Sequence, residues 1–459
     1  MNKLIALTLL LLAVCFTLHA GETYCFRIYL NNKGNTHYST DRPEEFLSQK
    51  AIERRLKMGK TITGSDLPIS IAYIDSLESA GATCVTQSKW LATLVVAVGD
   101  SLMVDHLRNF SFVDSVKWVW KGDADVAGQK ERTAADDTTR FYPDESVLAD
   151  YYGYARKQID MLKGIDLHEA GFTGEGIHIA VTDAGFTHVD RIALFDSLRL
   201  GGTRNFVAPG QSVFQGDDHG TKVLSCMAAN QPGIMVGTAP HATYWLLRSE
   251  DSTSEFPIEE DYWAAAAEFA DSVGVDMITS SLGYFVFDEE VMSYSQEALD
   301  GKTAFVTRAA ALAAEKGILV VCSAGNEGNN DWEKITFPSD AANILTVGAI
   351  THKKEKSNFS STGFTADYRV KPDVTALGSG CCVVNAKGQI RYVNGTSFST
   401  PIVAGLTACL WQAIPSLTPT DMIGLLQATA SQYKRPDAEK GYGIPDLHKA
   451  HKKGLKDAK

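Results

Sequence analysis

The hydrophobic and polar positions change their spacing repeatedly between residues 24 and 121. Stretches in which apolar residues alternate with polar ones are typical of half-buried strands, and stretches with helical spacing lie between them. Strands are predicted at 24–29, 83–88, 91–98 and 113–118, and helices at 71–80 and 102–109. This β-α-β-β-α-β order predicts a small split-βαβ domain, with a charged helical stretch at 42–57 inserted after its first strand.

From about Gln158 to Ala450 the pattern is different, because short apolar runs alternate with longer helical stretches. The clearest strands are predicted at 177–182, 242–247, 277–280, 318–322 and 344–347. Such alternation predicts an α/β fold with a buried, largely parallel sheet between helices. Ligands bind beyond the carboxyl ends of such strands, so polar residues directly after these runs are the candidates for chemistry.

The first residues have the order of a secretory signal. Met1-Asn-Lys is followed by an apolar run from Leu4 to Leu18 and then by small residues, which predicts a signal peptide over 1–20 and a secreted or cell-envelope (periplasmic) location. The alternatives are an uncleaved anchor, although the run is shorter than the ~20 residues that span a membrane, and lipidation at Cys15. Residues 122–150 are polar and aperiodic, so they are predicted to form an exposed, easily cut linker before the main domain at 151–459.

Composition limits the function classes. A length of 459 residues predicts two or three domains, at about 100–200 residues each. The formal charge of −12 argues against nucleic-acid binding, which needs clustered Lys and Arg. No segment after the signal has the apolar length of a membrane span, so none is expected in the mature chain.

The eight cysteines do not predict a disulfide framework. One lies in the signal and two in the N-terminal domain, which leaves an odd number for the main domain. Cys226, Cys322 and Cys409 sit in apolar runs and are predicted to be buried free thiols. Whether Cys381 and Cys382 pair elsewhere is left open.

Two candidate residues suit proton transfer. Asp183 ends an apolar strand in Ile179-Ala-Val-Thr-Asp, and a glycine follows shortly after it. His219 opens a helix in Asp217-Asp-His-Gly-Thr-Lys-Val, and an imidazole has the one ordinary side-chain pKa near neutrality. Each residue alone has a structural alternative, a turn or cap aspartate and a structural histidine.

Two further candidates suit attack on a carbonyl and stabilisation of the resulting charge. Ser397 precedes a Pro-initiated helix in Gly395-Thr-Ser-Phe-Ser-Thr-Pro, where the helix start favours negative charge. This is not the Gly-x-Ser-x-Gly elbow of α/β-hydrolases. Asn326, in Ser323-Ala-Gly-Asn, can donate to an oxyanion. A helix-cap serine and a turn asparagine are the alternatives.

Together these motifs resemble the subtilisin-like serine proteases (subtilases, peptidase family S8), in which the triad follows the chain order Asp, His, Ser. The match covers about 153–450 and includes further blocks, namely Ser280-Ser-Leu-Gly, Lys371-Pro-Asp-Val and Gly441-Tyr-Gly-Ile-Pro-Asp. The resemblance implies a subtilisin-like three-layer α/β/α domain at 151–459 and a ferredoxin-like α+β propeptide domain at 21–121. It also places the maturation site within the linker.

The resemblance implies a site and a mechanism as well. Ser397 would be the nucleophile, His219 the base, Asp183 its orienting carboxylate and Asn326 the oxyanion donor. The peptide would pair as an added strand with backbone from two segments. These substrate-binding residues are Ser281, Leu282, Gly283, Ser323, Ala324 and Gly325.

Polypeptide substrates and the chain's own propeptide, as an intramolecular inhibitor, are the implied partners, and nucleic acid is not one. The chemistry uses no cofactor and no metal. Family members often bind structural calcium, but no Asp-rich loop here has the spacing of a calcium site.

Three departures from the family pattern stand near the site. Ala184 occupies a position where the family usually has Ser or Thr, which puts the hydrogen bonding of Asp183 in doubt. Ala376-Leu-Gly replaces the usual Ala-Pro-Gly, and Phe398 replaces a common Met. None of these changes removes a catalytic group.

Two hypotheses from other classes remain for comparison. A catalytically silent peptide-binding module would keep the fold but would not react with a serine-directed phosphonate. A carboxyl peptidase of the same fold would use Glu in place of His and Asp for the oxyanion, and would work best in acid. His219 in Asp-His-Gly-Thr argues against the second, and the presence of all four groups argues against the first.

Overall fold

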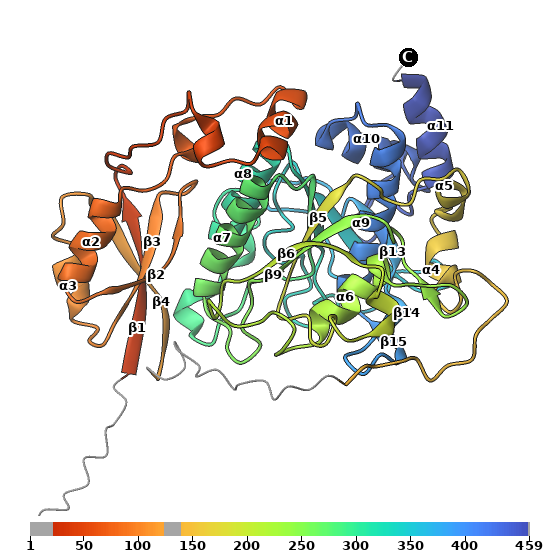
Figure 1. Cartoon of the computed structure of the whole chain (residues 1–459), viewed down its shortest axis with the longest axis horizontal. Helices are drawn as coiled ribbons and strands as arrows, with labels where there is room; N and C mark the ends of the chain where they lie inside the picture. The colour runs from red at the N-terminus through yellow and green to blue at the C-terminus, as the bar shows by residue number, and fades with distance from the viewer. Residues whose placement is uncertain (1–21, 124–138, 458–459) are drawn as a thin grey trace, which may run out of the picture.

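The structure, a computed structural model, describes residues 22–123 and 139–457. A small N-terminal domain (Glu22–Asp123) lies beside a larger C-terminal domain that begins at residue 139 (Figure 1). The signal peptide predicted over 1–20 and most of the predicted linker fall outside the described residues.

The N-terminal domain is one antiparallel sheet in the order β2-β3-β1-β4 with helices on one face. Its elements are β1 (Glu22–Leu30), α2 (Ile71–Ser79), β2 (Thr83–Ser88), β3 (Thr93–Val98), α3 (Met103–Leu107) and β4 (Val113–Asp123). Ile28, Leu94 and Leu107 are fully buried between the sheet and the helices. This arrangement confirms the predicted split-βαβ order.

The inserted segment of this domain packs on the other domain. The stretch predicted as one helix at 42–57 is a short turn, Pro43–Glu45, followed by α1 (Gln49–Lys57). Ser48 starts α1, because its side chain accepts a hydrogen bond from the backbone N–H of Ala51 at 3.2 Å. Figure 1 shows α1 above α7 and α8, away from its own sheet.

The C-terminal domain contains a seven-stranded sheet in the order β13-β12-β11-β10-β5-β9-β6, and all its neighbouring strands are parallel. Its strands are β5 (His178–Asp183), β6 (Arg199–Asn205), β9 (Thr243–Arg248), β10 (Met277–Ser280), β11 (Leu319–Ser323), β12 (Leu345–Ile350) and β13 (Val374–Leu377). The predicted parallel α/β sheet is therefore confirmed.

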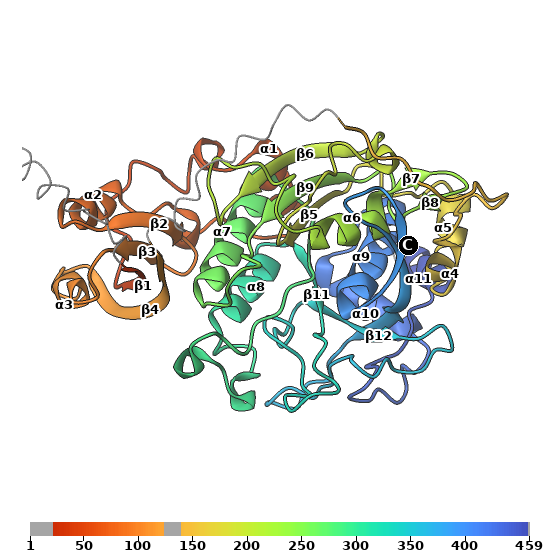
Figure 2. The ribbon, with the colours of Figure 1, turned by 90° about the horizontal axis from the view of Figure 1, so that it is seen from below.

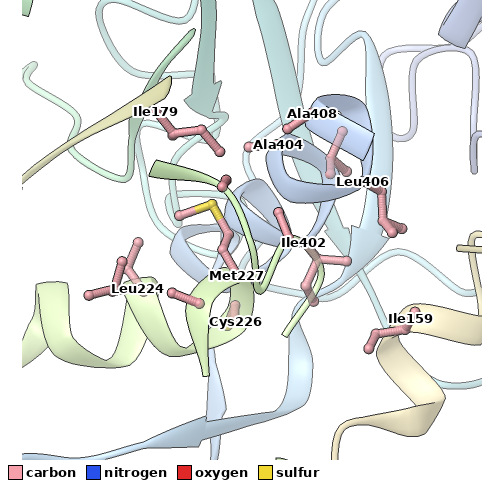
Figure 3. Close-up of a cluster of buried hydrophobic side chains, with 14 of the residues drawn as sticks. Ile159, Ile179, Leu224, Cys226, Met227, Ile402, Ala404, Leu406 and Ala408 are labelled. Carbon is pink, nitrogen blue, oxygen red and sulfur yellow. The ribbon is translucent and has the colours of Figure 1, made fainter. Parts of the chain in front are cut away.

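Helices cover both faces of this sheet and make three layers (Figure 2). α7 (Ile258–Val273) and α8 (Phe305–Glu315) lie on one face, and α6 (His219–Ala228) and α9 (Thr396–Ala413) lie on the other. Alternate residues of β5 serve the two faces, since Ile179 packs in the cluster of α6 and α9 whereas Ala180 packs in that of α7 and α8. In Figure 3, Met227 of α6 and Ile402 of α9 lie in one buried cluster with Ile179.

The two domains share a hydrophobic core. One buried cluster contains Cys25 and Trp120 of the N-terminal sheet, Trp90 of the turn between β2 and β3, and Phe256 and Tyr262 of the larger domain. Because each of these side chains is less than a tenth exposed, the sheet covers α7 directly.

The second half of the predicted linker lies along the C-terminal domain. The backbone N–H of Phe141 donates to the backbone oxygen of Arg191 at 3.0 Å, and the backbone oxygen of Phe141 accepts from the N–H of Ala193 at 2.9 Å. Leu148 donates to Gly233 at 2.9 Å. Residues 139–150 are thus bound to the larger domain, while the domain boundary at 150 stays a prediction.

The described cysteines are free thiols and form no disulfide. Cys226, Cys322 and Cys409 are fully buried, as predicted, and so are Cys381 and Cys382. Within residues 22–123 and 139–457, no helix combines the length and apolar character that crossing a bilayer requires.

Candidate active site

Asp183 is the last residue of β5 and is fully buried. Its Oδ1 accepts hydrogen bonds from His219 Nδ1 at 2.8 Å and from the backbone N–H of Ala184 at 2.9 Å. Its Oδ2 is buried, and no described residue donates to it. The hydrogen bond that Ser or Thr at position 184 could offer has therefore not been replaced by another side chain of the described chain.

His219 is the first residue of α6 and lies at the carboxyl edge of the sheet. The carboxylate of Asp217 accepts its backbone N–H at 2.6 Å, and Asp218 pairs with Lys222 at 2.5 Å. These two aspartates therefore serve the start of α6. The carboxylate that orients the imidazole of His219 is Asp183, because it is hydrogen-bonded to the ring.

The environment of His219 favours the protonated ring. Burial alone would lower the pKa of His219, but the charge and hydrogen bond of Asp183, followed by the charges of Glu250 and Asp217, raise it to about 9. A buried anion at hydrogen-bond distance is the main reason, because it stabilises the imidazolium.

Ser397 is the second residue of α9 and is 6% exposed. The prediction that it precedes a helix started by the proline is wrong, because α9 already begins at Thr396 and Pro401 lies inside it. Its hydroxyl donates to the backbone oxygen of Ser281 at 3.3 Å, and the Ser281 hydroxyl donates back to the Ser397 oxygen at 2.8 Å. No hydrogen bond joins Ser397 to His219 among the described residues, although the Phe398 ring lies 5.8 Å from the imidazole. Catalytic contacts of this kind often tighten only when substrate binds.

Asn326 lies just beyond β11 and is exposed. Its Oδ1 accepts from the backbone N–H of Thr396 at 2.8 Å and from the Thr396 hydroxyl at 3.0 Å. With the oxygen engaged beside Ser397, the amide nitrogen is the group left to donate. Thr396 sets this orientation and was not predicted. Its position directly before Ser397 was the available signal.

The predicted substrate-binding segments lie side by side. Ser323 Oγ donates to the backbone oxygen of Leu282 at 3.5 Å, which joins the segment 281–283 to the segment 323–325. Thr336 lies against a glycine of each segment: a Cβ on Gly283 would come within 2.1 Å of its hydroxyl, and one on Gly325 within 2.9 Å of its methyl. Gly325 also has a φ of +103°, which favours glycine.

Glu250 is a titratable group near His219 that the sequence alone did not single out. Burial first, and then the charges of Glu255 and Asp183, raise the pKa of Glu250 to about 8, while His219 and a hydrogen bond from Tyr284 oppose the shift. Glu250 comes shortly after the strand predicted at 242–247, so the rule that polar residues follow such strands could have identified it.

Among the described residues, no group of three or more His, Cys, Asp or Glu side chains is arranged to hold a metal ion. The expectation of chemistry without a cofactor stays a prediction, as does the possibility of structural calcium.

Family comparisons agree with this geometry. Residues 174–443, more than half of the chain, match the model described as the subtilase family, and residues 25–136 match the peptidase S8 propeptide domain of Bacteroidota. These matches confirm the predicted family resemblance and the presence of a propeptide.

Individual relatives show the same likeness. Subtilisin E of Bacillus subtilis is 28% identical over 302 residues, which is 64% of this chain and 71% of the relative. Alkaline elastase YaB of a Bacillus species is 25% identical over 398 residues, 82% of this chain and 94% of the relative.

A solved structure confirms the fold. The crystal structure of MycP1 with the N-terminal propeptide removed is similar with a TM-score of 0.50 and 23% identity, over 64% of this chain and 96% of that one. Together with the family matches, these relatives establish that the chain belongs to the subtilase family and is a serine-type endopeptidase with an N-terminal propeptide domain.

Proposed function

We propose that this chain is a secreted, self-processed endopeptidase in which Ser397 attacks the peptide carbonyl and forms an acyl-enzyme. The observation that carries the proposal is the 2.8 Å contact between Asp183 and His219 at the carboxyl edge of the sheet, beside the start of α9. His219 takes the Ser397 proton, and Asp183 holds the imidazole tautomer and stabilises the imidazolium. His219 then protonates the leaving amine, and water resolves the acyl-enzyme.

Asn326 and the backbone N–H of Ser397 hold the oxyanion that develops on the carbonyl. Support comes from Thr396, which engages the Asn326 oxygen and leaves its amide nitrogen to donate. The substrate pairs with the segments 281–283 and 323–325 as an added strand. Polypeptides are the substrates.

The propeptide domain acts as the intramolecular inhibitor until the chain cuts itself between the two domains. The shared core between the propeptide sheet and α7 supports this role, because it keeps the propeptide on the peptidase. Export through the N-terminal signal would deliver the enzyme outside the cytoplasm, as a secreted or periplasmic protein.

Ser397→Ala in the full chain tests the proposal. We expect this variant to fold, as judged by circular dichroism, and to remain an intact precursor, because it lacks the nucleophile. Ser416→Ala is the matched control, since Ser416 is an exposed serine of the same domain and should leave processing unchanged. Normal processing of Ser397→Ala would mean that another protease matures the chain.

A further inference from the structure

Glu250 stands between the two segments that flank the triad aspartate. β9 runs beside β5, so that Arg248 is in register with Asp183, and the backbone N–H of Ser249 donates to the backbone oxygen of Asp183 at 3.1 Å. Glu250 is the next residue. Its side chain therefore begins at the carboxyl edge of the sheet, directly beside the triad aspartate.

Tyr284 connects Glu250 to the other flank. It follows the segment 281–283, and its hydroxyl donates to Glu250 Oε2 at 3.4 Å. Because β10 and β9 are the two neighbours of β5, this contact spans the end of the strand that carries Asp183. Glu250 is also partly exposed, so a bound peptide can reach it.

Glu250 has no basic partner among the described residues. Tyr284 is the one side chain that hydrogen-bonds it, and no described lysine or arginine forms an ion pair with it. Its charged neighbours include two other acids, Glu255 and Asp183, and the catalytic His219. Holding a carboxylate among other acids costs free energy. A cationic side chain that binds there gains an ion-pair partner and reduces the repulsion between the acids.

The geometry of an extended peptide indicates which substrate residue would contact Glu250. Successive side chains of a strand point to opposite sides. If the residue before the cleaved bond points between the segments 281–283 and 323–325, the preceding residue points the other way, toward His219 and Glu250.

We propose that Glu250 is a specificity-determining residue that selects lysine or arginine as the second residue before the cleaved bond. The proposal rests on the proposed function, since it assumes the acyl transfer at Ser397. An acidic residue at the same substrate position is excluded, because it would face Glu250 and Asp183.

Internally quenched peptides that differ only at this position test the proposal on the mature enzyme produced from the full chain. We expect kcat/KM to be about 10- to 100-fold higher for Lys or Arg than for Met, the range of a charge-assisted hydrogen bond, and lowest for Glu. In Glu250→Gln the preference should fall to within about threefold. Glu315→Gln, an exposed acid on α8, should keep it.

Each outcome decides the question. Equal cleavage of the Lys and Met peptides, a preference that survives in Glu250→Gln, or a basic preference at another position would overturn the role of Glu250 while leaving the proposed peptidase intact. Failure to cleave any peptide, together with failure to react with a phosphonate, would remove the proposed function itself. The kcat/KM ratios between peptides are compared within each variant. A smaller amount of folded enzyme therefore cannot be mistaken for a change in specificity.

Discussion

Arg27 of the propeptide is predicted to hold the two domains together. It lies on β1, is fully buried, and donates three hydrogen bonds of 2.6–2.9 Å to Asp261 and one of 2.9 Å to the backbone oxygen of Pro257. Its guanidinium also lies 3.7 Å from the centre of the Phe305 ring. Asp261, Pro257 and Phe305 all belong to the peptidase domain.

Arg27→Met removes the counter-charge of Asp261 and keeps an apolar side chain of similar length. Removing one member of a buried ion pair costs about 3–5 kcal/mol, because the other charge stays buried and unpaired. Replacing both members by apolar residues is often neutral. Arg27→Met/Asp261→Leu should therefore be more stable than Arg27→Met alone.

The loss of stability caused by Arg27→Met should depend on pH. Burial raises the pKa of Asp261 to about 6, although Arg27 opposes that shift. Without Arg27 the pKa rises further, so in acid Asp261 becomes neutral and no longer suffers from the missing partner. The destabilisation by Arg27→Met should be larger at pH 8 than at pH 5.

Guanidinium unfolding of the uncut Ser397→Ala chain measures these effects, with tryptophan fluorescence as the probe, because Trp90 and Trp120 are buried at the domain contact. Arg42→Met is the control, since Arg42 is 55% exposed in its pair with Glu45 and should cost at most about 1 kcal/mol. The reasoning would be refuted if Arg27→Met lowered the free energy of unfolding no more than the control does, or if the double variant were less stable than Arg27→Met.

Three predictions concern the catalytic edge. Surrounding anions raise the pKa of His219 to about 9, so kcat/KM should rise with pH toward that value as the neutral imidazole forms. Glu250→Gln should move the midpoint of this pH profile to lower pH, and an unchanged midpoint would contradict the prediction. Ala184→Ser places a donor near the unpartnered Oδ2 of Asp183 and should raise the free energy of unfolding by about 0.5–1.5 kcal/mol in a denaturant titration, whereas no gain would show that the hydroxyl does not reach it. Asn326→Ala should lower kcat about 10²–10³-fold with little change in KM, and a purely KM effect would argue against oxyanion donation.

The sequence predicted the main domain well, because its signals are local. The five strands predicted for this sheet are each marked by a short apolar run, and Asp183, His219 and Asn326 lie at or just beyond strand ends or helix starts. The polar edge strand β6 is an exception. Most of its residues are exposed, and Gly201 and Gly202 leave room for the Trp245 ring of the neighbouring strand, so hydrophobic alternation does not mark it.

Long-range polar contacts could not be predicted in the same way. Arg27 occupies an ordinary position in an alternating strand, and its partner Asp261 is 234 residues further along the chain. The inserted α1 likewise looks like a solvated charged helix, but the structure buries Arg54 and Arg55 against Asp271 of the peptidase domain. Nothing in the local pattern distinguishes a buried arginine from an exposed one.

The central claim is that Ser397 is the nucleophile, and intact-mass analysis after treatment with a serine-directed phosphonate tests it most directly. The mature enzyme should gain the mass of one adduct, and peptide mapping should place it on Ser397, with no adduct on the chain that carries His219→Ala. An adduct on another serine, or cleavage of peptides by an enzyme that the phosphonate leaves unmodified at Ser397, would contradict the account.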